Sequence, residues 1–482
     1  NERKLNMSGK IKEPKVKAPK IKSQVRPIEK ASYGIYFFGQ GIIFTIVSQY
    51  LMLYYTDYIF ISPGIVTAIM FGGKIWDAVN DMLFGMIVDK VKFKSGNRFL
   101  PWIRVSTFLI PISTVLLFVL NKDMAMWLRV TLAVVTYLVW DSAYTICDAP
   151  IYALNTAMTQ NVKERGTIMT FSGMGGAVAT ALTTIVFVPY FDAHGFLNTS
   201  ILIAVIGFAT MVWIGIFGKE RYHATDVHQE QNASLRDTWI YLKGNKYLLY
   251  FYAYRIISGS IAVSMLSYMS IYCLGGVEYT SKITLISIPL IGVLYLLSPF
   301  ILKKFNKIYI YRFCVIGEMA MNLVTWMIGY ENKTLTMVMC ALILAFAILP
   351  LMLNGVMPAD GIEYGTYKTG KRKEGITFAI QTFANKFTAA IATGISGLVL
   401  TFLNFEAEAY QVNGEVVLSM VPESVINGIW NANFLVPMIG KLIAIGFLFA
   451  YNLKDKDVQI MSDVNAGKLT REEAETMLSR KY

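Results

Sequence analysis

Long apolar segments follow one another along the chain from Tyr33 to about position 452, separated by short polar stretches. Each segment is long enough to cross the hydrocarbon core of a bilayer, which needs about 20 mostly apolar residues in a helix. The pattern predicts an all-α integral membrane protein with twelve transmembrane helices. The expected spans are residues 33–55, 62–88, 101–121, 126–157, 166–190, 197–218, 248–274, 281–301, 308–330, 334–357, 373–403 and 426–452.

A long polar stretch at residues 219–247 divides the expected spans into two sets of six. Two six-helix halves joined by a polar linker are typical of the major facilitator fold, which is built from parallel repeats. Near the C-terminus, Thr470 and Glu473 form a capping-box pattern that predicts a short helix. The expected organisation is a basic cytoplasmic tail (1–32), an N-terminal half (33–218), a cytoplasmic linker (219–247), a C-terminal half (248–452) and a cytoplasmic tail with a short helix (453–482).

Composition supports the membrane class and excludes others. The chain of 482 residues is 55% hydrophobic and only 16% charged, whereas soluble domains carry about 25% charged residues. Its four cysteines are widely spaced inside apolar runs and form neither a metal-ligand pattern nor a disulfide framework. The three histidines lie in expected loops, so no nucleophile–histidine set points to an enzyme and no cofactor is expected.

Positive charge is concentrated in particular segments. The chain has a formal net charge of +12, and its first thirty residues hold ten Lys or Arg against three Glu. A basic chain is often a nucleic-acid binder, but basic loops beside apolar spans follow the positive-inside rule instead. Loops at 89–98 and 368–373 are basic, whereas 404–425 has four Glu and no Lys or Arg. We therefore expect a multi-pass cell-membrane protein with both termini in the cytoplasm and no nucleic-acid partner.

The second expected span carries charged side chains at membrane depth. Asp77 and Asp81 are four residues apart and Asn80 directly precedes Asp81, so all three cluster on one helix face. Two carboxylates in a low dielectric repel, so a proton or a bound cation is needed between them. Oxygen ligands suit a hard cation such as Na⁺, and Lys74 can neutralise one carboxylate when the cation is absent. A structural charge network between helices is the alternative.

The fourth span carries one polar stripe. Asp141, Tyr144, Thr145, Asp148 and Tyr152 recur at helical spacing. A carboxylate accepts hydrogen bonds from sugar hydroxyls and an aromatic ring covers the apolar face of a pyranose, so the stripe is a candidate sugar site. Hydrogen bonding between helices is the alternative.

Two further basic residues lie within expected spans. Lys386 is deep in span eleven, whereas Arg255 in span seven is closer to the cytoplasmic end, where an arginine can extend its charged group toward water.

Several of these motifs together resemble the glycoside–pentoside–hexuronide:cation symporter family, and in particular its melibiose-permease-like members. The resemblance runs through roughly 33–450. It rests on Leu51-Met-Leu-Tyr-Tyr-Thr-Asp57, Trp76-Asp77-Ala-Val-Asn80-Asp81, Arg98-Phe-Leu-Pro101-Trp102, Tyr144-Thr-Ile-Cys-Asp148-Ala-Pro150 and Ala359-Asp360 with Glu363-Tyr-Gly365-Thr-Tyr367-Lys368.

The resemblance implies a secondary symporter in a bacterial cell membrane that couples Na⁺, or H⁺ or Li⁺, to sugar uptake. The cation site it implies consists of Asp77, Asn80, Asp81 and Thr145. The implied sugar contacts are Asp148 and Tyr152, with Tyr144 beside them, and Lys386 and Lys74 balance charge. Function as a monomer is the default for the fold.

Departures from the family pattern affect the sugar side. Two charged positions of span one fall on Gln40 and Gly41, an arginine of span five falls on Gly173, and Asp141 stands where a glycine is usual. The cargo is therefore an open choice among a glycoside, an oligosaccharide, a pentoside and a uronide, and Asp141 is a candidate replacement carboxylate. A lysolipid or other amphiphile, or export rather than uptake, is the alternative reading.

Charged loops also resemble the gates of major facilitators. Asp89 with Arg98, and Asp360 with Glu363 in the second half, are the expected gating residues, and charges that only set topology are the alternative.

Overall fold

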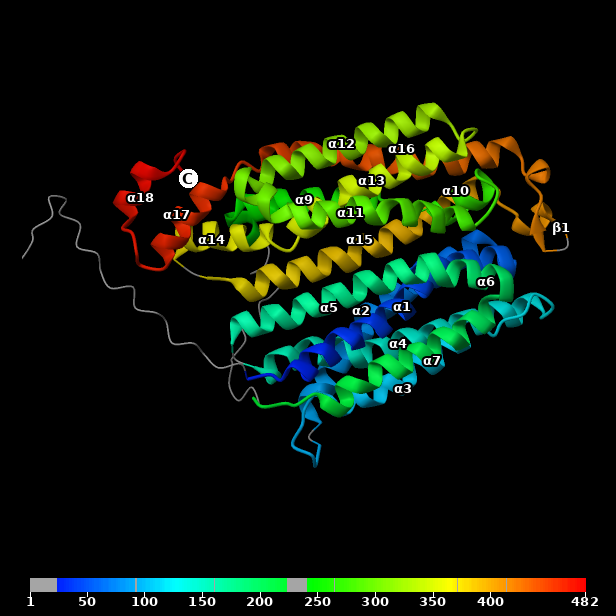
Figure 1. Cartoon of the computed structure of the whole chain (residues 1–482), viewed down its shortest axis with the longest axis horizontal. Helices are drawn as coiled ribbons and strands as arrows, with labels where there is room; N and C mark the ends of the chain where they lie inside the picture. Colours follow the sequence, from blue (N-terminus) through cyan, green and yellow to red (C-terminus); the bar gives the residue numbers. More distant parts are fainter. Residues whose placement is uncertain are drawn as a thin grey trace, which may run out of the picture.

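The computed structural model describes residues 24–91, 93–159, 161–222, 241–263, 265–370, 372–412 and 414–482. Long helices run side by side along the longest axis of the molecule, as Figure 1 shows. We call the elements before the linker the first helix group. It contains α1 (Pro27–Leu53) with the π-helical turn η1 (Tyr54–Tyr58), α2 (Pro63–Lys90), α3 (Leu100–Leu117), α4 (Met126–Met158), α5 (Val162–Leu182) with η2 (Thr183–Phe187) and α6 (Val188–His194), and α7 (Phe196–Phe217).

The elements from α9 to α16 form the second helix group. Its helices are α9 (Lys246–Ser260), α10 (Leu266–Tyr272), α11 (Glu278–Lys304), α12 (Lys307–Ile328), α13 (Lys333–Leu353), α14 (Met357–Thr369), α15 (Glu374–Phe402) and α16 (Glu423–Ala450). Between α15 and α16 lie the short helix η3 (Ala407–Tyr410), the hairpin of β1 (Gln411–Val412) and β2 (Glu415–Val416), and η4 (Leu418–Met420). Two helices, α17 (Asp455–Asn465) and α18 (Arg471–Met477), end the chain.

The two groups lie on opposite sides of the molecule and meet through a few helices. Within the first group α1 packs on α5 and α7, and α4 packs on α2 and α3. Within the second group α9 packs on α15 and α16, and α13 packs on α11 and α12. The main contact between the groups is α2 with α15, supplemented by α11 with η2 and α6.

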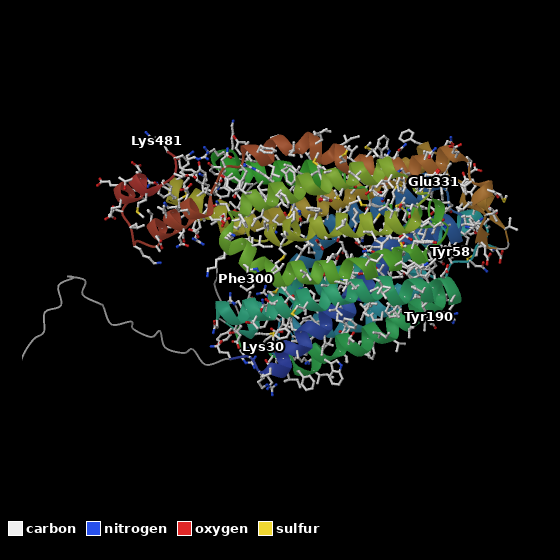
Figure 2. The ribbon with its side chains drawn as sticks, turned by 45° about the horizontal axis from the view of Figure 1, so that its top comes forward. Lys30, Tyr58, Tyr190, Phe300, Glu331 and Lys481 are labelled. Carbon is white, nitrogen blue, oxygen red and sulfur yellow. The ribbon has the colours of Figure 1, made fainter. Side chains whose placement is uncertain are left out.

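The two ends of the helix bundle differ. We call the end with α14, α17 and α18 the tail end, and the end with the β1–β2 hairpin the hairpin end (Figure 1). In Figure 2, Lys30 and Lys481 lie toward the tail end, whereas Tyr58, Tyr190 and Glu331 lie at the hairpin end. Both described chain ends therefore emerge on one side of the bundle.

Each expected span coincides largely with described helices, although span 248–274 is interrupted between Ser260 and Leu266. Among the described residues, nine helices are long and apolar enough to cross a membrane. The other three expected spans correspond to α2 and α12, whose charged residues lower their mean hydropathy, and to the pair α9–α10, which is interrupted after Ser260. The fold is consistent with twelve spans, although length and composition alone select nine of these helices.

The first helix begins earlier than its apolar run predicts. Position 33 is the expected start, but α1 begins at Pro27. Glu29 is fully buried there because it pairs with Arg221 at 2.7 Å and with Arg26 at 2.6 Å. Ion pairing satisfies the polar first turn, so the helix extends past the apolar segment. Most of the expected N-terminal tail and residues 223–240 of the expected linker lie outside the described residues.

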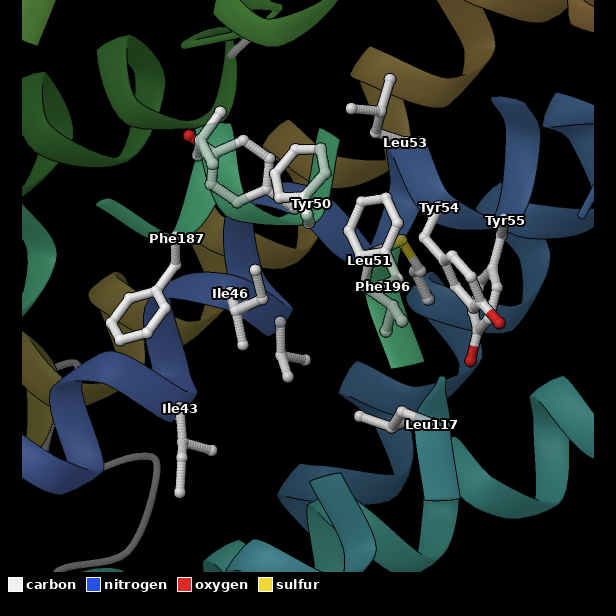
Figure 3. Close-up of a cluster of buried hydrophobic side chains, with 14 of the residues drawn as sticks. Ile43, Ile46, Tyr50, Leu51, Leu53, Tyr54, Tyr55, Leu117, Phe187 and Phe196 are labelled. Atoms are coloured by element: carbon white, nitrogen blue, oxygen red, sulfur yellow. The ribbon is translucent and has the colours of Figure 1, made fainter. Parts of the chain in front are cut away.

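Buried side chains join the two groups at the hairpin end. Figure 3 shows part of this core, where Tyr50, Leu51 and Tyr54 lie among Leu117, Phe187 and Phe196. The same cluster continues into α10 and the hairpin region of the second group, whereas a second cluster lies wholly within the second group and its tail.

Hydrogen bonds at the hairpin end also cross between the groups. Tyr272 donates to the carboxylate of Asp57 at 2.5 Å, the hydroxyls of Thr56 and Tyr268 lie 2.8 Å apart, and Gln411 donates to the Asp57 carbonyl at 2.9 Å. Together with the shared core, these contacts close the hairpin end.

The C-terminal tail folds onto the second group. The capping box of Thr470 and Glu473 is present at α18, as predicted, and α17 precedes it as an additional helix. Asp457 of α17 is buried and accepts hydrogen bonds from Ser479 and from Tyr482.

Candidate functional site

An ion-paired cluster of α2 and α15 lies where the two groups meet. The Lys386 ammonium is 3.3 Å from a carboxylate oxygen of Asp77 and forms a direct ion pair with Asp81. Asp77 and Asp81 are one turn apart on α2, so one lysine reaches both. The two aspartates that the spacing placed on one face are thus joined to Lys386, which lies 309 residues beyond Asp77 along the chain.

The cluster is at membrane depth and is accessible to water. Asp77 is about 21 Å along α2 from Pro63, at 1.5 Å per residue, near the middle of a bilayer core. The side chains of Lys386 and Asp81 are nevertheless 39% and 36% exposed. Ionised groups are costly in hydrocarbon at this depth, so we expect the exposed side of the cluster to face water rather than lipid.

Helix α2 packs closely on α4 at Gly73, four residues before Asp77. A Cβ at Gly73 would lie 2.0 Å from the ring of Tyr137 in α4, which no real contact allows. Glycine at position 73 therefore lets the Tyr137 ring pack directly against the backbone of α2.

Lys74 does not pair with Asp77, although their spacing suggests that this lysine could neutralise one carboxylate. Among the described residues no carboxylate lies within ion-pair distance of Lys74, and its electrostatic interaction is with Asp141. Lys386 pairs with Asp77 and Asp81 instead, because α15 packs directly against this face of α2.

The two neutral members of the expected cation site keep polar atoms without partners. The Thr145 hydroxyl and the Asn80 amide nitrogen are buried and have no hydrogen-bond partner within the described part of the chain. Leaving such atoms unpaired costs about 1–3 kcal/mol each. The Thr145 hydroxyl oxygen can be satisfied by water or by a cation, whereas the Asn80 nitrogen is a donor and needs an acceptor such as a water oxygen. The described residues contain no group of three His, Cys, Asp or Glu side chains fit to hold a metal ion, so a sodium site here would need the Thr145 hydroxyl and the side-chain oxygen of Asn80.

The stripe on α4 faces α1. Asp148 accepts a hydrogen bond from the side-chain amide of Gln40 at 3.2 Å, and the Tyr144 hydroxyl is 3.4 Å from the Gln40 carbonyl oxygen. Gln40 therefore positions the central carboxylate of the stripe. From the sequence, Gln40 is only a departure from a charged position of span one, so its contact with Asp148 was not expected.

The remaining stripe residues differ in accessibility. Asp141 is buried with one carboxylate oxygen unpartnered among the described residues, whereas Tyr152 is 51% exposed and its ring lies 5.5 Å from that of Phe37. Asp141 and Asp148 both interact electrostatically with the Asp77–Asp81–Lys386 cluster. The stripe therefore lies within electrostatic range of the cluster.

Arg255 contacts the neighbouring helix α15, and its expected extension toward the cytoplasmic end stays a prediction. Its guanidinium donates to the side-chain oxygen of Asn385 at 2.8 Å, and Asn385 directly precedes Lys386 on α15.

The expected gating residues make contacts inside single groups. Asp360 pairs with Lys307 at 2.6 Å, and Glu363 pairs with Arg372 at 2.8 Å. The backbone amide of Arg98 donates to Glu220 at 2.7 Å, a partner that sequence reasoning missed. The side chain of Asp89 lies outside the described residues, so the expected lock between Asp89 and Arg98 stays a prediction.

Curated relatives of the chain are transporters. It is 28% identical to the uncharacterized symporter YjmB of Bacillus subtilis, over 91% of this chain and 95% of that protein. It is 26% identical to the isoprimeverose transporter of Lactiplantibacillus pentosus, over 92% of each. Among solved structures, the nucleoside transporter NupG aligns with a TM-score of 0.58 at 14% identity, over 88% of this chain and all of that one. That likeness concerns the fold.

The family model described as MFS/sugar transport protein matches residues 32–455, which is nearly the whole membrane region. With the helical architecture and the relatives above, this match identifies the chain as a multi-pass membrane transporter rather than an enzyme, and places it in the MFS/sugar transport protein family, with the major facilitator fold.

Proposed function

We propose that the protein is a secondary active symporter that couples inward flow of Na⁺, or of H⁺, to uptake of a sugar across the bacterial cell membrane. The tail end faces the cytoplasm in this proposal, in line with the basic loops and the positive-inside rule. The closed hairpin end then faces outward, so the structure corresponds to an inward-facing state of an alternating-access cycle.

The observation that carries the proposal is the pairing of Lys386 with both Asp77 and Asp81 across the group boundary. A cation bound to the two carboxylates competes with Lys386 for the same oxygens. Binding therefore releases a contact between α2 and α15, which is the main junction of the two groups. Asn80 and Thr145 complete the proposed cation site with neutral oxygens.

The sugar site in this proposal is the α4 stripe. Asp148, held by Gln40, accepts hydrogen bonds from sugar hydroxyls, and the exposed ring of Tyr152 covers an apolar sugar face. Tyr144 lies beside them, and Asp141 and Lys386 connect the stripe to the cation site. Because coupling is reciprocal, cation and sugar raise each other's affinity by the same factor.

The test is sugar binding with and without Na⁺. Purified full-length protein is screened by thermal shift against D-glucose, D-galactose, D-xylose, D-glucuronate and D-galacturonate, and active sugars are then followed by uptake into proteoliposomes. We expect Na⁺ to strengthen binding of at least one sugar, and Asp81→Asn to remove that effect.

Glu318→Gln is the matched control, because Glu318 also pairs with a membrane-embedded lysine, Lys441, but within the second group. It should retain the sodium effect. Full stimulation in the Asp81 variant would contradict the cation-site assignment, and a sodium-independent response to a proton gradient would assign the coupling to H⁺. Binding of a lysolipid but of none of the sugars would contradict sugar transport.

A further inference from the structure

We infer that a groove of the second group binds an anionic phospholipid of the surrounding membrane, with an acyl chain in the groove and the phosphate at Lys303 and Lys304. The groove is lined by residues of α11, α12 and α13 and of the short connection after α11. The proposed cation and sugar sites lie on α2, α4 and α15, so this inference does not depend on the cargo.

The groove exists because two helices that follow each other along the chain do not pack together. Helices α11 and α12 each pack on α13, which lies between them in the view of Figure 1, but they have few contacts with one another. The space that they leave has a volume of about 750 Å³, which is within the usual range of ligand pockets. Ala345 and Leu349 of α13 are buried and form its floor.

The walls of the groove are apolar. Among the described residues that line it none is charged, and Val293 of α11 and Phe313 of α12 are exposed. In the membrane such side chains meet lipid tails, which are as apolar as leucine. A chain lying in the groove supplies the van der Waals contacts that α11 and α12 do not give one another.

The groove is as deep as one leaflet of a bilayer. Its α11 wall runs from Ile301, in the last turn of the helix, to Leu290, a distance of about 16 Å at 1.5 Å per residue. Half of a hydrocarbon core is about 15 Å thick. A groove that begins at a helix end and stops near mid-membrane matches an acyl chain from the leaflet at the tail end.

Basic side chains lie on both sides of the groove where it opens at the tail end. Lys303 and Lys304 end α11, and both are exposed and have no ion-pair partner among the described residues. The Lys304 ammonium lies 5.6 Å from the centre of the Phe305 ring, which lines the groove. On the α12 side, the Arg312 guanidinium lies 5.8 Å from the ring of Tyr309, which also lines it.

Two carboxylates on this side do not cancel that charge. Asp360 and Asp455 both pair with Lys307 at the start of α12, at 2.6 Å and 3.7 Å. The three basic side chains beside the opening outnumber the single negative charge that this group leaves, so these residues are positive as a set. Basic pockets between membrane helices bind anionic head groups, whereas a zwitterionic head group brings an ammonium that the lysines repel.

Lysines at a helix end are also what the positive-inside rule predicts. Topology alone, however, does not require an apolar groove of leaflet depth directly below them. The charge and the groove are independent observations, and an anionic phospholipid is the partner that satisfies both.

The experiment compares two lipids with the same acyl chains. Full-length protein in detergent is titrated with dioleoylphosphatidylglycerol, which is anionic, or with dioleoylphosphatidylethanolamine, which is zwitterionic, and native mass spectrometry counts the lipids bound to each chain. We expect one phosphatidylglycerol to bind more tightly than phosphatidylethanolamine. The double variant Lys303→Gln with Lys304→Gln should weaken phosphatidylglycerol binding by about 10- to 30-fold.

A second variant tests the groove instead of the charge. Val293 is 54% exposed, so Val293→Trp places a larger ring in the space between α11 and α12 and should abolish the tight binding of phosphatidylglycerol. Val205→Trp is its control, because Val205 is a 61% exposed valine of α7 in the first group. Lys243→Gln with Lys246→Gln removes two exposed lysines at the start of α9, outside the groove, and is the control for charge. Both controls should bind phosphatidylglycerol as the wild type does.

Three results would overturn the inference. Equal binding of the two lipids by the wild type is the first, and it does not depend on any variant folding. An equal loss of binding in the Lys243 and Lys246 control is the second, because the attraction would then belong to the basic surface as a whole. A dimer that excludes the lipid is the third, since it would give the groove to a second copy of the chain. Each of these results leaves the sodium and sugar tests unchanged, so the proposed function stands or fails separately.

Discussion

Among the described ion pairs, Lys441–Glu318 and the Lys386–Asp77–Asp81 cluster differ in what they connect. Lys441 of α16 and Glu318 of α12 pair inside the second group and are only 15% and 13% exposed. Lys386 pairs with Asp77 and Asp81 across the boundary between groups, with Lys386 39% exposed. The first is a closed pair with one charge of each sign. The second has one more carboxylate than lysine and faces water.

The difference shows which membrane charges can do more than stabilise packing. A buried one-to-one pair has little reason to change during transport, because breaking it leaves two uncompensated charges. A hydrated cluster with an excess carboxylate can exchange its lysine for another cation at lower cost. The position of a charge relative to the group boundary is therefore more informative than its depth alone.

The largest expected effect is loss of Lys386. Lys386→Ala leaves Asp77 and Asp81 facing each other without their cation, so the junction of α2 and α15 is disturbed and the coupling of cation to sugar is lost. We expect sodium-driven sugar uptake in proteoliposomes to fall by about 100-fold or more, which corresponds to about 2.7 kcal/mol. Uptake at the wild-type rate would show that the cluster is structural.

Loss of Lys441 should mainly lower the stability of the protein and leave sodium coupling in place. Lys441→Ala leaves Glu318 buried without a counter-charge, which costs about 3–5 kcal/mol in the free energy of unfolding. We expect a clearly lower melting temperature in detergent with sodium stimulation of uptake retained. If Lys441→Ala were as stable as wild type but lost coupling, the contrast between the clusters would be wrong.

A smaller effect is expected on the sugar side of the open cluster. Gln40→Ala removes the hydrogen bond to Asp148, so the carboxylate is less well positioned. We expect sugar affinity to fall about tenfold, measured by equilibrium binding, while the sodium-induced thermal shift persists. Gln40→Glu is a useful companion, because a second carboxylate beside Asp148 should reduce affinity further.

The smallest expected effect concerns Asp457, whose carboxylate accepts hydrogen bonds from neutral groups. Burial by itself raises the pKa of Asp457, but hydrogen bonds from Ser479 and Tyr482 outweigh burial and leave the pKa below its ordinary value. The ionised form therefore stabilises the docked tail at pH values above about 4, and this stabilisation is lost as the pH falls through the lowered folded-state pKa.

Hydrogen exchange of α17 and the last residues measures that docking. In the wild type we expect protection from exchange to decrease below about pH 4. In Asp457→Asn the free energy of opening should already be lower by about 1–2 kcal/mol near neutral pH. A pH-independent difference between the two proteins would show that charge on Asp457 does not hold the tail.

Much of the architecture follows from the order of the residues. Apolar runs of membrane-spanning length predict the helices, and the spacing of Asp77, Asn80 and Asp81 puts them on one face because a helix repeats every 3.6 residues. The capping box at Thr470 was equally local and is present. These features depend on neighbours within one or two turns, so they could be predicted without knowing the packing.

Partner choice could not be predicted in the same way. Lys74 is the nearest lysine in sequence to Asp77, yet Lys386 takes the pair, because the packing of α15 on α2 decides which charges meet. The contact of Gln40 with Asp148, the Asp57–Tyr272 bond at the hairpin end and the contact of Arg255 with Asn385 likewise join residues far apart in the chain. Local periodicity determines which side chains share a helix face, but electrostatic pairing acts over a few ångströms between helices, and only their packing brings those faces together.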